Sequence, residues 1–226
     1  MTPKQVYSTI VKSLKHGNIK DNILLKGMPG IAKTAVIEQA CKDAGFELIV
    51  EHGVTSDPID SKGLPSVSTD PMTLEPRAEF VPFGNMKAII EAKVPTVVFL
   101  DDIGQAAPAV QGSWMQPVHD RRLNTFKIPD CVRFIAATNR REDKAGVSKV
   151  ITAFVSRFAI NLTVEPDLQS WSEYSVTDPD IDPTVVSFAR FVHQDGDPVF
   201  QFDPSRELEN PTVPRTLTAL GRLHKC

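Results

Sequence analysis

The stretch that most constrains the fold runs from position 23 to position 34 and reads Ile-Leu-Leu-Lys-Gly-Met-Pro-Gly-Ile-Ala-Lys-Thr. Its first three residues are apolar and predict a buried strand, and a helical spacing of apolar residues begins at Lys33. Gly27 and Gly30 lie between these two segments. This order of strand, loop and helix predicts a phosphate-binding loop of the pattern G-x-x-x-x-G-K-S/T, in which Ala32 replaces the last glycine.

The residue types of this loop suit phosphate chemistry. Backbone N–H groups of a loop and of a helix start converge on a phosphate, and glycines permit the positive φ angles and close approach that this requires. Lys33 offers positive charge to the β- and γ-phosphates, and the Thr34 hydroxyl is a ligand for Mg²⁺. An alanine fits at position 32 if the chain is already helical there, and an ordinary strand–turn–helix is the alternative interpretation. We expect the nucleotide to contact Gly27, Met28, Pro29, Gly30, Ile31, Ala32, Lys33 and Thr34.

A second informative stretch, residues 96–106, places two carboxylates at the end of an apolar run. Residues 97–100 are Val-Val-Phe-Leu, and Asp101 and Asp102 follow them directly. Ligands bind at the carboxyl edge of open parallel sheets, and a carboxylate there is costly unless it faces solvent or a cation. The pair therefore predicts a cation site beside the phosphate loop. The alternative is a polar strand end that meets water.

Composition narrows the class of protein. The chain has 226 residues, 41% hydrophobic and 23% charged, which is ordinary for a globular protein. Its net charge of −3 gives no overall basic field for nucleic acid. No apolar run approaches the roughly 20 residues that span a bilayer, and the N-terminal residues lack the apolar core of a signal peptide. Three isolated cysteines and five histidines without ligand spacing predict neither a disulfide framework nor a metal cluster, so we expect a cytoplasmic protein without membrane insertion.

Apolar periodicity predicts an α/β fold. Expected strands lie at 23–25, 46–50, 97–100, 131–137 and 158–164; expected helices lie at 3–15, 33–44, 85–93, 107–119, 147–155, 168–174, 184–193 and 216–223; and a short hairpin is expected within 121–128. Because the strands mostly alternate with helices, we expect a P-loop NTPase with a five-stranded parallel sheet covered by helices on both faces. Pro166 marks the expected boundary between a nucleotide-binding core, residues 1–165, and a small helical lid, residues 166–226.

Residues 53–84 have no clear periodicity and are rich in Pro, Asp, Ser and Gly. We expect a long loop here, with room for one short element. Loops of that length in compact domains usually have a function. Our hypothesis is that this segment carries a surface that contacts a partner protein.

Several segments, in this order, resemble the AAA+ ATPases and, within them, the MoxR-like group. They are Gly-Met-Pro-Gly-Ile-Ala-Lys-Thr at 27–34, Phe-Leu-Asp-Asp-Ile-Gly-Gln-Ala at 99–106, residues 115–122, Ala-Ala-Thr-Asn at 136–139 and Val-Ser-Arg-Phe at 155–158. The resemblance covers about residues 15–165 and reaches the helical tail only through Asn-Pro-Thr-Val-Pro-Arg at 210–215. It implies a ring-forming ATPase, a hexamer, that uses ATP and Mg²⁺ to remodel or assemble a protein partner.

The resemblance implies roles in the first half of the chain. Lys33 would bind the β- and γ-phosphates, and Thr34 and Asp101 would hold Mg²⁺. Asp102 occupies the place of a glutamate that polarises the attacking water. An aspartate is one methylene shorter, about 1.5 Å in reach, and a misplacement of that size costs on the order of 100-fold in rate. We therefore expect slow hydrolysis.

Three further residues receive roles from the resemblance. Asn139 would be the sensor-1 residue, Arg157 the arginine finger that acts on a neighbouring subunit, and Arg215 the sensor-2 arginine of the lid. Each has a simpler interpretation: Asn139 caps a turn, Arg157 lies at a helix end on the surface, and Arg215 belongs only to a helix start. The arginines at 121–122 and 140–141 form a basic patch, which we expect to pair with acids across a subunit interface or to stay solvated rather than to bind nucleic acid.

Two rival functions remain open at this point. One is a nucleotide-gated assembly or scaffold protein that binds ATP, oligomerises and barely hydrolyses it, an interpretation that the aspartate at position 102 favours. The other is a nucleic-acid-directed motor, which the charge balance disfavours. A GTPase is not expected, because the stretch nearest to an Asn-Lys-x-Asp motif is Thr-Asn-Arg-Arg at 138–141.

Overall fold

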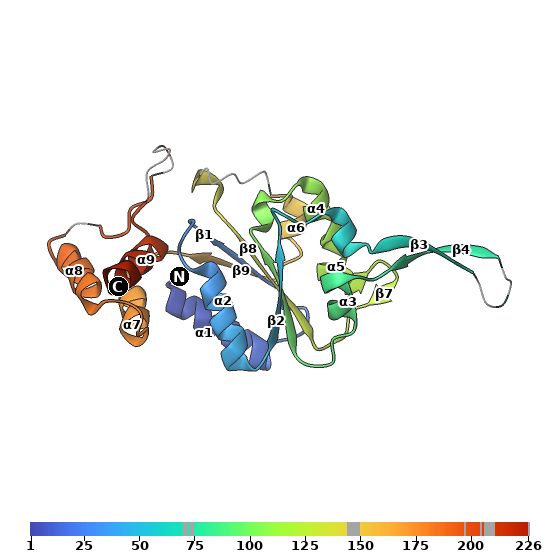
Figure 1. The fold of residues 1–226 in the computed structure, drawn as a ribbon, viewed down its shortest axis with the longest axis horizontal. Helices are drawn as coiled ribbons and strands as arrows, with labels where there is room; N and C mark the ends of the chain where they lie inside the picture. The colour runs from blue at the N-terminus through green and yellow to red at the C-terminus, as the bar shows by residue number, and fades with distance from the viewer. Residues whose placement is uncertain are drawn as a thin grey trace.

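The computed structural model describes residues 1–69, 72, 75–143, 150–196, 198–203, 205 and 211–225. Its centre is a five-stranded sheet in the order β2-β5-β8-β1-β9, with every neighbouring pair parallel (Figure 1). The strands are β1 Ile23–Gly27, β2 Glu47–His52, β5 Thr96–Asp101, β8 Val132–Thr138 and β9 Ile160–Val164. The expected parallel sheet is thus confirmed, with strand bounds shifted by one or two residues at several ends.

The apolar runs of the sequence become central strands because both faces of the sheet are covered. Every residue of β5 is buried, and its side chains alternate between two apolar clusters. Val97 and Phe99 belong to the cluster on one face, whereas Val98 and Leu100 belong to the cluster on the other. A strand buried on both faces is expected to be apolar throughout rather than alternating.

Helices cover the two faces unequally. Those of one face are α1 Pro3–His16 and α2 Lys33–Ala44, and those of the other are α3 Gly84–Ile90, α4 Pro108–Ser113, α5 Met115–Asp120 and α6 Thr152–Val155. The single helix expected at 107–119 is wrong, because the chain breaks it at Trp114. Pro117 explains the break, since it lacks the N–H that would bond to Ser113, and its ring clashes with that carbonyl. Residues 147–149 of another expected helix lie outside the described residues.

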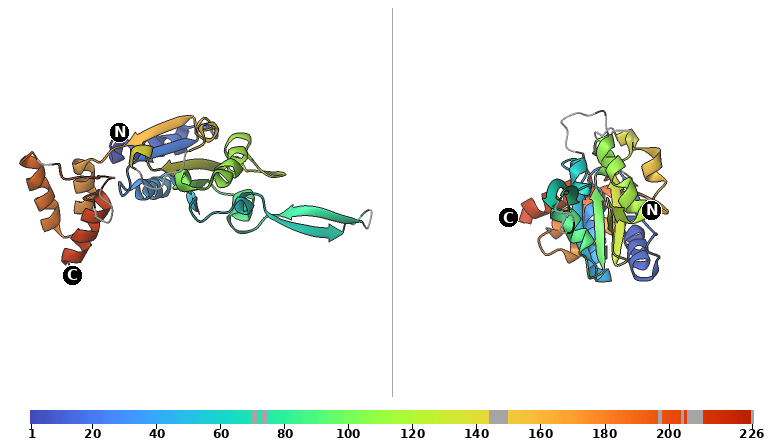
Figure 2. Two further views of the ribbon diagram at one scale, coloured as in Figure 1. Left: turned by 90° about the horizontal axis from the view of Figure 1, so that it is seen from above. Right: turned by 90° about the vertical axis from the view of Figure 1, so that its right-hand side faces the viewer.

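Three helices after the sheet form a unit that we call the C-terminal bundle: α7 Leu168–Thr177, α8 Pro183–Gln194 and α9 Pro214–Lys225. The bundle packs around its own apolar cluster, which includes Trp171, Val186 and Leu217. An ion pair of 2.7 Å between Lys4 of α1 and Glu173 of α7 links the bundle to the helices that cover the sheet. Figure 2 shows the bundle at one end of an elongated molecule.

The expectation of a long loop at 53–84 is wrong. The described part contains a 3₁₀ turn, η1 Pro58–Ser61, and an antiparallel hairpin made of β3 Leu64–Thr69 and β4 Pro76–Val81. Nearly all of its residues are exposed, and Figure 2 shows it extending from the body at the end opposite the bundle. Strands that bury neither face need no apolar alternation, and prolines are tolerated in such edge strands.

The expectation of a basic surface patch at 121–122 is also wrong for Arg121, which is only 6% exposed. Its guanidinium donates to the backbone oxygens of Pro129 at 2.6 Å and Val132 at 3.0 Å and lies over the Phe134 ring. The short hairpin expected there is present as β6 Arg122–Leu123 and β7 Phe126–Lys127. Within the described residues, no helix has the length and apolar character needed to cross a membrane.

Candidate nucleotide-binding site

The loop between β1 and α2 carries two residues in the left-handed conformation. Gly30 has φ 76° and Ala32 has φ 70°. The chain is therefore not helical at position 32, which corrects the condition under which an alanine was expected to fit. A Cβ in this conformation is strained by roughly 1–2 kcal/mol, so Ala32 holds a backbone shape that a glycine adopts freely.

Lys33 is the first residue of α2 and is 7% exposed. Its ammonium donates to the carbonyl oxygens of Gly27 at 2.9 Å and Met28 at 3.0 Å and to the side-chain oxygen of Asn139 at 2.6 Å. Burial lowers the pKa of Lys33 to about 8, although the nearby Asp102 and Asp101 carboxylates oppose this shift. The charge is thus held inside the loop by neutral oxygens rather than by an ion pair.

Asp101 is the last residue of β5 and lies beside the start of α2. The Thr34 hydroxyl donates to an Asp101 carboxylate oxygen at 3.0 Å, and Asp101 is 9% exposed. Hydroxyl and carboxylate oxygens are the hard ligands that Mg²⁺ takes beside phosphate oxygens. The donor set therefore fits Mg²⁺.

Asp102 follows in a left-handed conformation, φ 48°, at the start of the 3₁₀ turn η2 Ile103–Gln105. Burial raises the pKa of Asp102, and the negative charge of Asp101 raises it further. The Asn139 amide donates to an Asp102 carboxylate oxygen at 3.3 Å. Since the same side chain accepts from Lys33, Asn139 joins the phosphate loop to the second aspartate.

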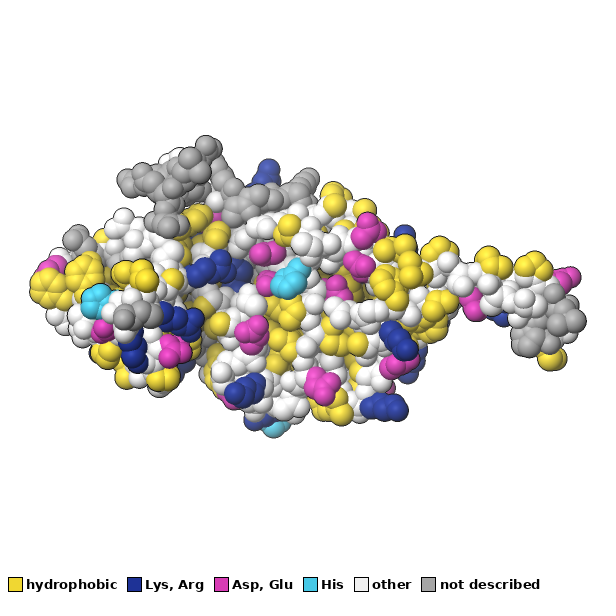
Figure 3. Space-filling view, in the orientation of Figure 1, with side chains coloured by type: hydrophobic (Ala, Val, Ile, Leu, Met, Phe, Trp, Pro, Cys, Tyr) yellow, Lys and Arg dark blue, Asp and Glu magenta, His cyan; other side chains and the backbone are white. Residues whose placement is uncertain are grey.

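The start of α9 reaches the phosphate loop from the C-terminal bundle. The Arg215 backbone N–H donates to the Gly30 oxygen at 3.1 Å, and a Cβ at Gly30 would lie 2.6 Å from the Val213 side chain. The Arg215 charge adds to the lowering of the Lys33 pKa and partly opposes the rise in the pKa of Asp102. Basic and acidic side chains accordingly gather between the bundle and the sheet (Figure 3).

Within the described part of the chain, Arg157 makes no hydrogen bond to Lys33, Asp101 or Asp102. It follows α6, and its guanidinium donates to the Ala153 backbone oxygen. Its Nε is buried, and among the described residues it has no hydrogen-bond partner.

Two titratable residues next to the site, His52 and Asp143, were not predicted from the sequence to belong to it. His52 ends β2 in register with Asp101 and partly offsets the rise in the pKa of Asp102. Asp143, in the 3₁₀ turn η3 Arg141–Asp143, is 4% exposed and pairs with Arg140 at 2.9 Å. A signal for His52 was available, because it ends an apolar strand as Asp101 does.

Comparison with known proteins places the chain in a family. Residues 23–166 match the ATPase family associated with various cellular activities (AAA), which is more than half of the sequence. The chain belongs to the AAA family. No curated protein matches the sequence.

Solved structures of RuvB from Thermotoga maritima share the AAA fold of this chain. Two point mutants cover 97% of it with TM-scores of 0.59 and 0.57 at 16% and 17% identity. A structure titled as the RuvB Holliday junction branch migration motor covers 76% of it with a TM-score of 0.50 at 18% identity. Identities this low show the fold alone. The chain spans 47% to 60% of the length of these three structures.

Proposed function

We propose that this AAA chain binds ATP with Mg²⁺ and hydrolyses it slowly. The observation that carries the proposal is the convergence of five side chains at one edge of the sheet: Lys33, Thr34, Asp101, Asp102 and Asn139. Three separate strands contribute to this group, and one polar edge with a buried cation and two carboxylates suits phosphoryl transfer to water.

The proposed mechanism assigns each side chain one task. Lys33 turns its ammonium from the loop carbonyls to the β- and γ-phosphates, and the backbone N–H groups of the loop, which Pro29 lacks, hold the phosphate chain. Thr34 and Asp101 would hold Mg²⁺, which neutralises charge on the phosphate oxygens when bound. Asp102 accepts a proton from the attacking water, and Asn139 orients that water or the γ-phosphate. Arg215 adds positive charge from the bundle side.

We further propose a MoxR-like ring, a hexamer, in which Arg157 acts on the nucleotide of the neighbouring subunit. Arg157 makes no hydrogen bond to Lys33, Asp101 or Asp102 among the described residues, and this supports an action in trans. In this proposal residues 1–165 are the nucleotide-binding core and 166–226 are the lid. Mixing inactive Arg157→Ala chains with inactive Lys33→Ala chains should restore phosphate release, because mixed rings contain complete sites.

A mass determination with and without a non-hydrolysable ATP analogue tests nucleotide binding and assembly together. We expect a shift from a low-mass species to a ring when the analogue and Mg²⁺ are present. Lys33→Ala should abolish the shift, and Lys42→Ala, an exposed change on the same helix, should leave it intact. Assembly to the same mass with and without the analogue would contradict the proposal.

The β3–β4 hairpin is the proposed contact surface for the partner protein. Pro65 and Phe80 face each other across the two strands, as do Val67 and Ala78, so one hairpin face is apolar and uncovered. A two-stranded hairpin without such support is marginal in water. Replacing residues 64–81 with a short Gly/Ser linker should spare ATP binding and abolish partner-dependent changes in phosphate release. Loss of ATP binding would refute the assignment.

A nucleotide-gated scaffold is the second candidate. The shorter carboxylate at position 102 favours weak hydrolysis. Phosphate release measured on assembled and on unassembled protein distinguishes the ATPase from the nucleotide-gated scaffold. RuvB is described as a Holliday junction branch migration motor, but the net charge of −3 of this chain disfavours a nucleic-acid substrate. Salt-dependent binding to DNA would revive it.

A further inference from the structure

The turn that carries Asp102 is shaped by local hydrogen bonds. The Asp102 backbone N–H donates to a carboxylate oxygen of Asp101 at 3.0 Å, and the Gln105 N–H donates to the Asp102 backbone oxygen at 2.8 Å. Because these bonds stay within residues 101–105, they do not fix the position of η2 against the neighbouring strands. That position decides where the carboxylate of the proposed general base lies.

On one side, η2 packs against β8 through Gly104. Gly104 is buried, and a Cβ built on it would overlap the hydroxyl oxygen of Thr138 and lie 3.1 Å from the Thr138 Cβ. Thr138 is itself 2% exposed, and its hydroxyl donates to the Asn139 backbone oxygen at 3.0 Å. Turning this hydroxyl away from an added methyl would break the bond to Asn139. A side chain at position 104 therefore has no room between η2 and β8.

On the other side, η2 packs against Gly53, the buried residue that follows β2. A Cβ built on Gly53 would lie 2.9 Å from the Ile103 Cα and 3.1 Å from the Asp102 backbone oxygen. Carbon atoms in contact are normally about 3.5–4.0 Å apart, and backbone atoms cannot rotate away as a side chain can. The Gly53 N–H also donates to the Asp101 backbone oxygen at 2.8 Å, which holds Gly53 in this place.

Space, rather than backbone conformation, is the reason for both glycines. Neither Gly53 nor Gly104 is among the described glycines with a positive φ, such as Gly45. A methyl added to Gly112 would meet no atom within 4 Å, so tight contact is not common to all described glycines. Close approach of one backbone to another is the second use of glycine. Here two such approaches meet the same turn.

We infer that Gly53 and Gly104 are positioning residues that hold η2 between β2 and β8 and so place the Asp102 carboxylate against the attacking water. We call this pair the glycine clamp. Its role rests on the proposed function, because Asp102 is the general base of that reaction. The aspartate side chain is short and cannot make up for a displaced turn. A misplacement of about 1 Å costs on the order of 100-fold in rate.

Steady-state phosphate release and calorimetric binding of a non-hydrolysable ATP analogue test the clamp on the full chain. Gly104→Ala and Gly53→Ala should each lower turnover at saturating ATP by roughly tenfold or more, because the added methyl displaces η2. Affinity for the analogue should change by less than about threefold, since an interaction made only in the transition state is lost.

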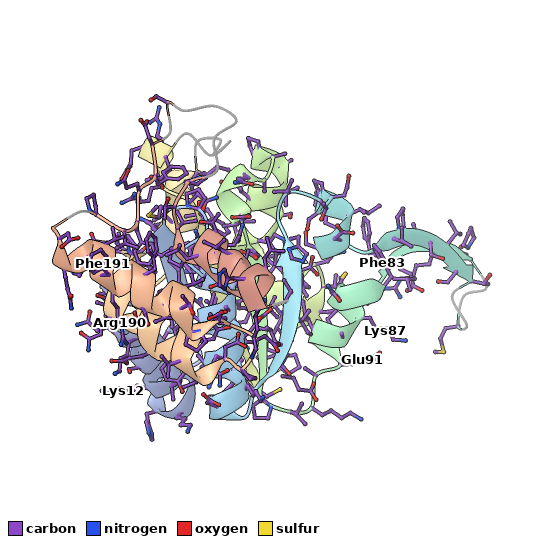
Figure 4. The ribbon with its side chains drawn as sticks, turned by 60° about the vertical axis from the view of Figure 1, so that its left-hand side comes forward. Lys12, Phe83, Lys87, Glu91, Arg190 and Phe191 are labelled. Carbon is purple, nitrogen blue, oxygen red and sulfur yellow. The ribbon has the colours of Figure 1, made fainter. Side chains whose placement is uncertain are left out.

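Two alanine substitutions outside the clamp serve as controls. Gly112→Ala adds a methyl at an exposed position of α4 where it meets no neighbour. Lys87→Ala changes an exposed residue of α3, whose side chain points away from the helix in Figure 4. Both variants should show the turnover of wild type.

A second substitution separates positioning from a general loss of folding. Thr138→Ala removes the hydroxyl that the methyl of Gly104→Ala meets, so the double variant should recover most of the lost turnover. The same Thr138→Ala should not rescue Gly53→Ala, because the methyl there meets backbone atoms. Non-additivity in the first pair alone is the mark of a direct contact. Thermal melts of all variants check folding.

The pKa of the Asp102 carboxyl, followed by carbon-13 NMR, gives a readout that needs no hydrolysis. Burial and the charge of Asp101 raise this pKa in the wild-type chain. In Gly104→Ala the pKa should fall toward the ordinary value of about 3.9, since a displaced turn moves the carboxyl into water. It should rise again when Thr138→Ala is added, and Asp102→Asn assigns the signal. A wild-type chain without phosphate release would contradict the proposed function alone, because the clamp is still tested by this pKa.

Four results would overturn the clamp. The first is wild-type turnover in both Gly104→Ala and Gly53→Ala, and the second is an Asp102 pKa that Gly104→Ala leaves unchanged. The third is a folded Gly104→Ala chain whose lost turnover Thr138→Ala does not restore. The fourth is a loss of analogue affinity as large as the loss of turnover, which would assign these glycines to nucleotide binding instead.

Discussion

The ammonium of Lys33 donates a 2.6 Å hydrogen bond to the side-chain oxygen of Asn139. This bond joins the phosphate loop, which follows β1, to the end of the neighbouring strand β8. The amide of the same Asn139 donates to Asp102 at 3.3 Å. A bound phosphate that attracts the Lys33 ammonium away from Asn139 therefore changes the hydrogen bonds of Asn139. This side chain contacts Asp102, the proposed general base.

The first prediction concerns Asn139→Ala. We expect phosphate release to fall about 100-fold, as when one preorganised donor is removed from a transition state. ATP affinity should change only a few-fold, because Lys33 and the backbone N–H groups of the loop still bind the phosphates. Steady-state phosphate release and calorimetric ATP binding measure the two effects. Asn161→Ala, on the exposed part of β9, is the control and should behave as wild type.

A second prediction concerns pH. The pKa of Lys33 is lowered to about 8 without ligand, and a bound triphosphate favours the charged form and raises this pKa. Binding therefore takes up a proton at alkaline pH. ATP affinity should be constant below about pH 8 and then fall by up to about tenfold per pH unit. Calorimetry from pH 7 to pH 9.5 measures this, and Lys33→Met should remove the dependence. A wild-type ATP affinity that does not change between pH 7 and pH 9.5 would contradict this prediction.

The third prediction concerns Asp102→Glu. The longer side chain should raise phosphate release by about 10- to 100-fold, because it restores about 1.5 Å of reach. Part of the gain is lost, since aspartate tolerates the left-handed backbone of this position better than glutamate. Asp102→Asn, which cannot accept the proton, should show no release. If Asp102→Glu is no faster than wild type, the short carboxylate is not what limits turnover.

A fourth prediction concerns Ala32→Gly. Relief of the left-handed alanine should raise the free energy of unfolding by about 1 kcal/mol, measured by urea titration. Gly45→Ala is the inverse control at φ 76°, where an added Cβ meets no atom within 4 Å, and it should destabilise by a similar amount. A less stable Ala32→Gly would mean that the alanine methyl makes contacts that outweigh the strain.

The sheet and the grouping of polar residues at its edge follow from short-range patterns. The run at 97–100 is buried on both faces, so its composition alone predicts a central strand. Asp101 ends a strand of one parallel sheet, and Lys33 and Asn139 follow two other strands of it, and parallel strands end at the same edge. Their proximity could therefore be predicted without knowing any contact.

Other features depend on tertiary contacts that no local pattern encodes. The exposed β3–β4 hairpin has no buried face to impose a period on its sequence. The burial of Arg121 depends on its contacts with the backbone oxygens of Pro129 and Val132. Gly104 and Thr138 lie on η2 and β8, so no segment alone predicts their close approach.

Phosphate release from ATP and Mg²⁺ by the purified chain is the most direct test of the account. Wild-type protein should release phosphate slowly but above a protein-free blank, Lys33→Ala should fall to that blank, and Lys42→Ala should match wild type. Release that persists in Lys33→Ala, or a wild-type chain that releases none with Mg²⁺ present, would contradict ATP hydrolysis at this site.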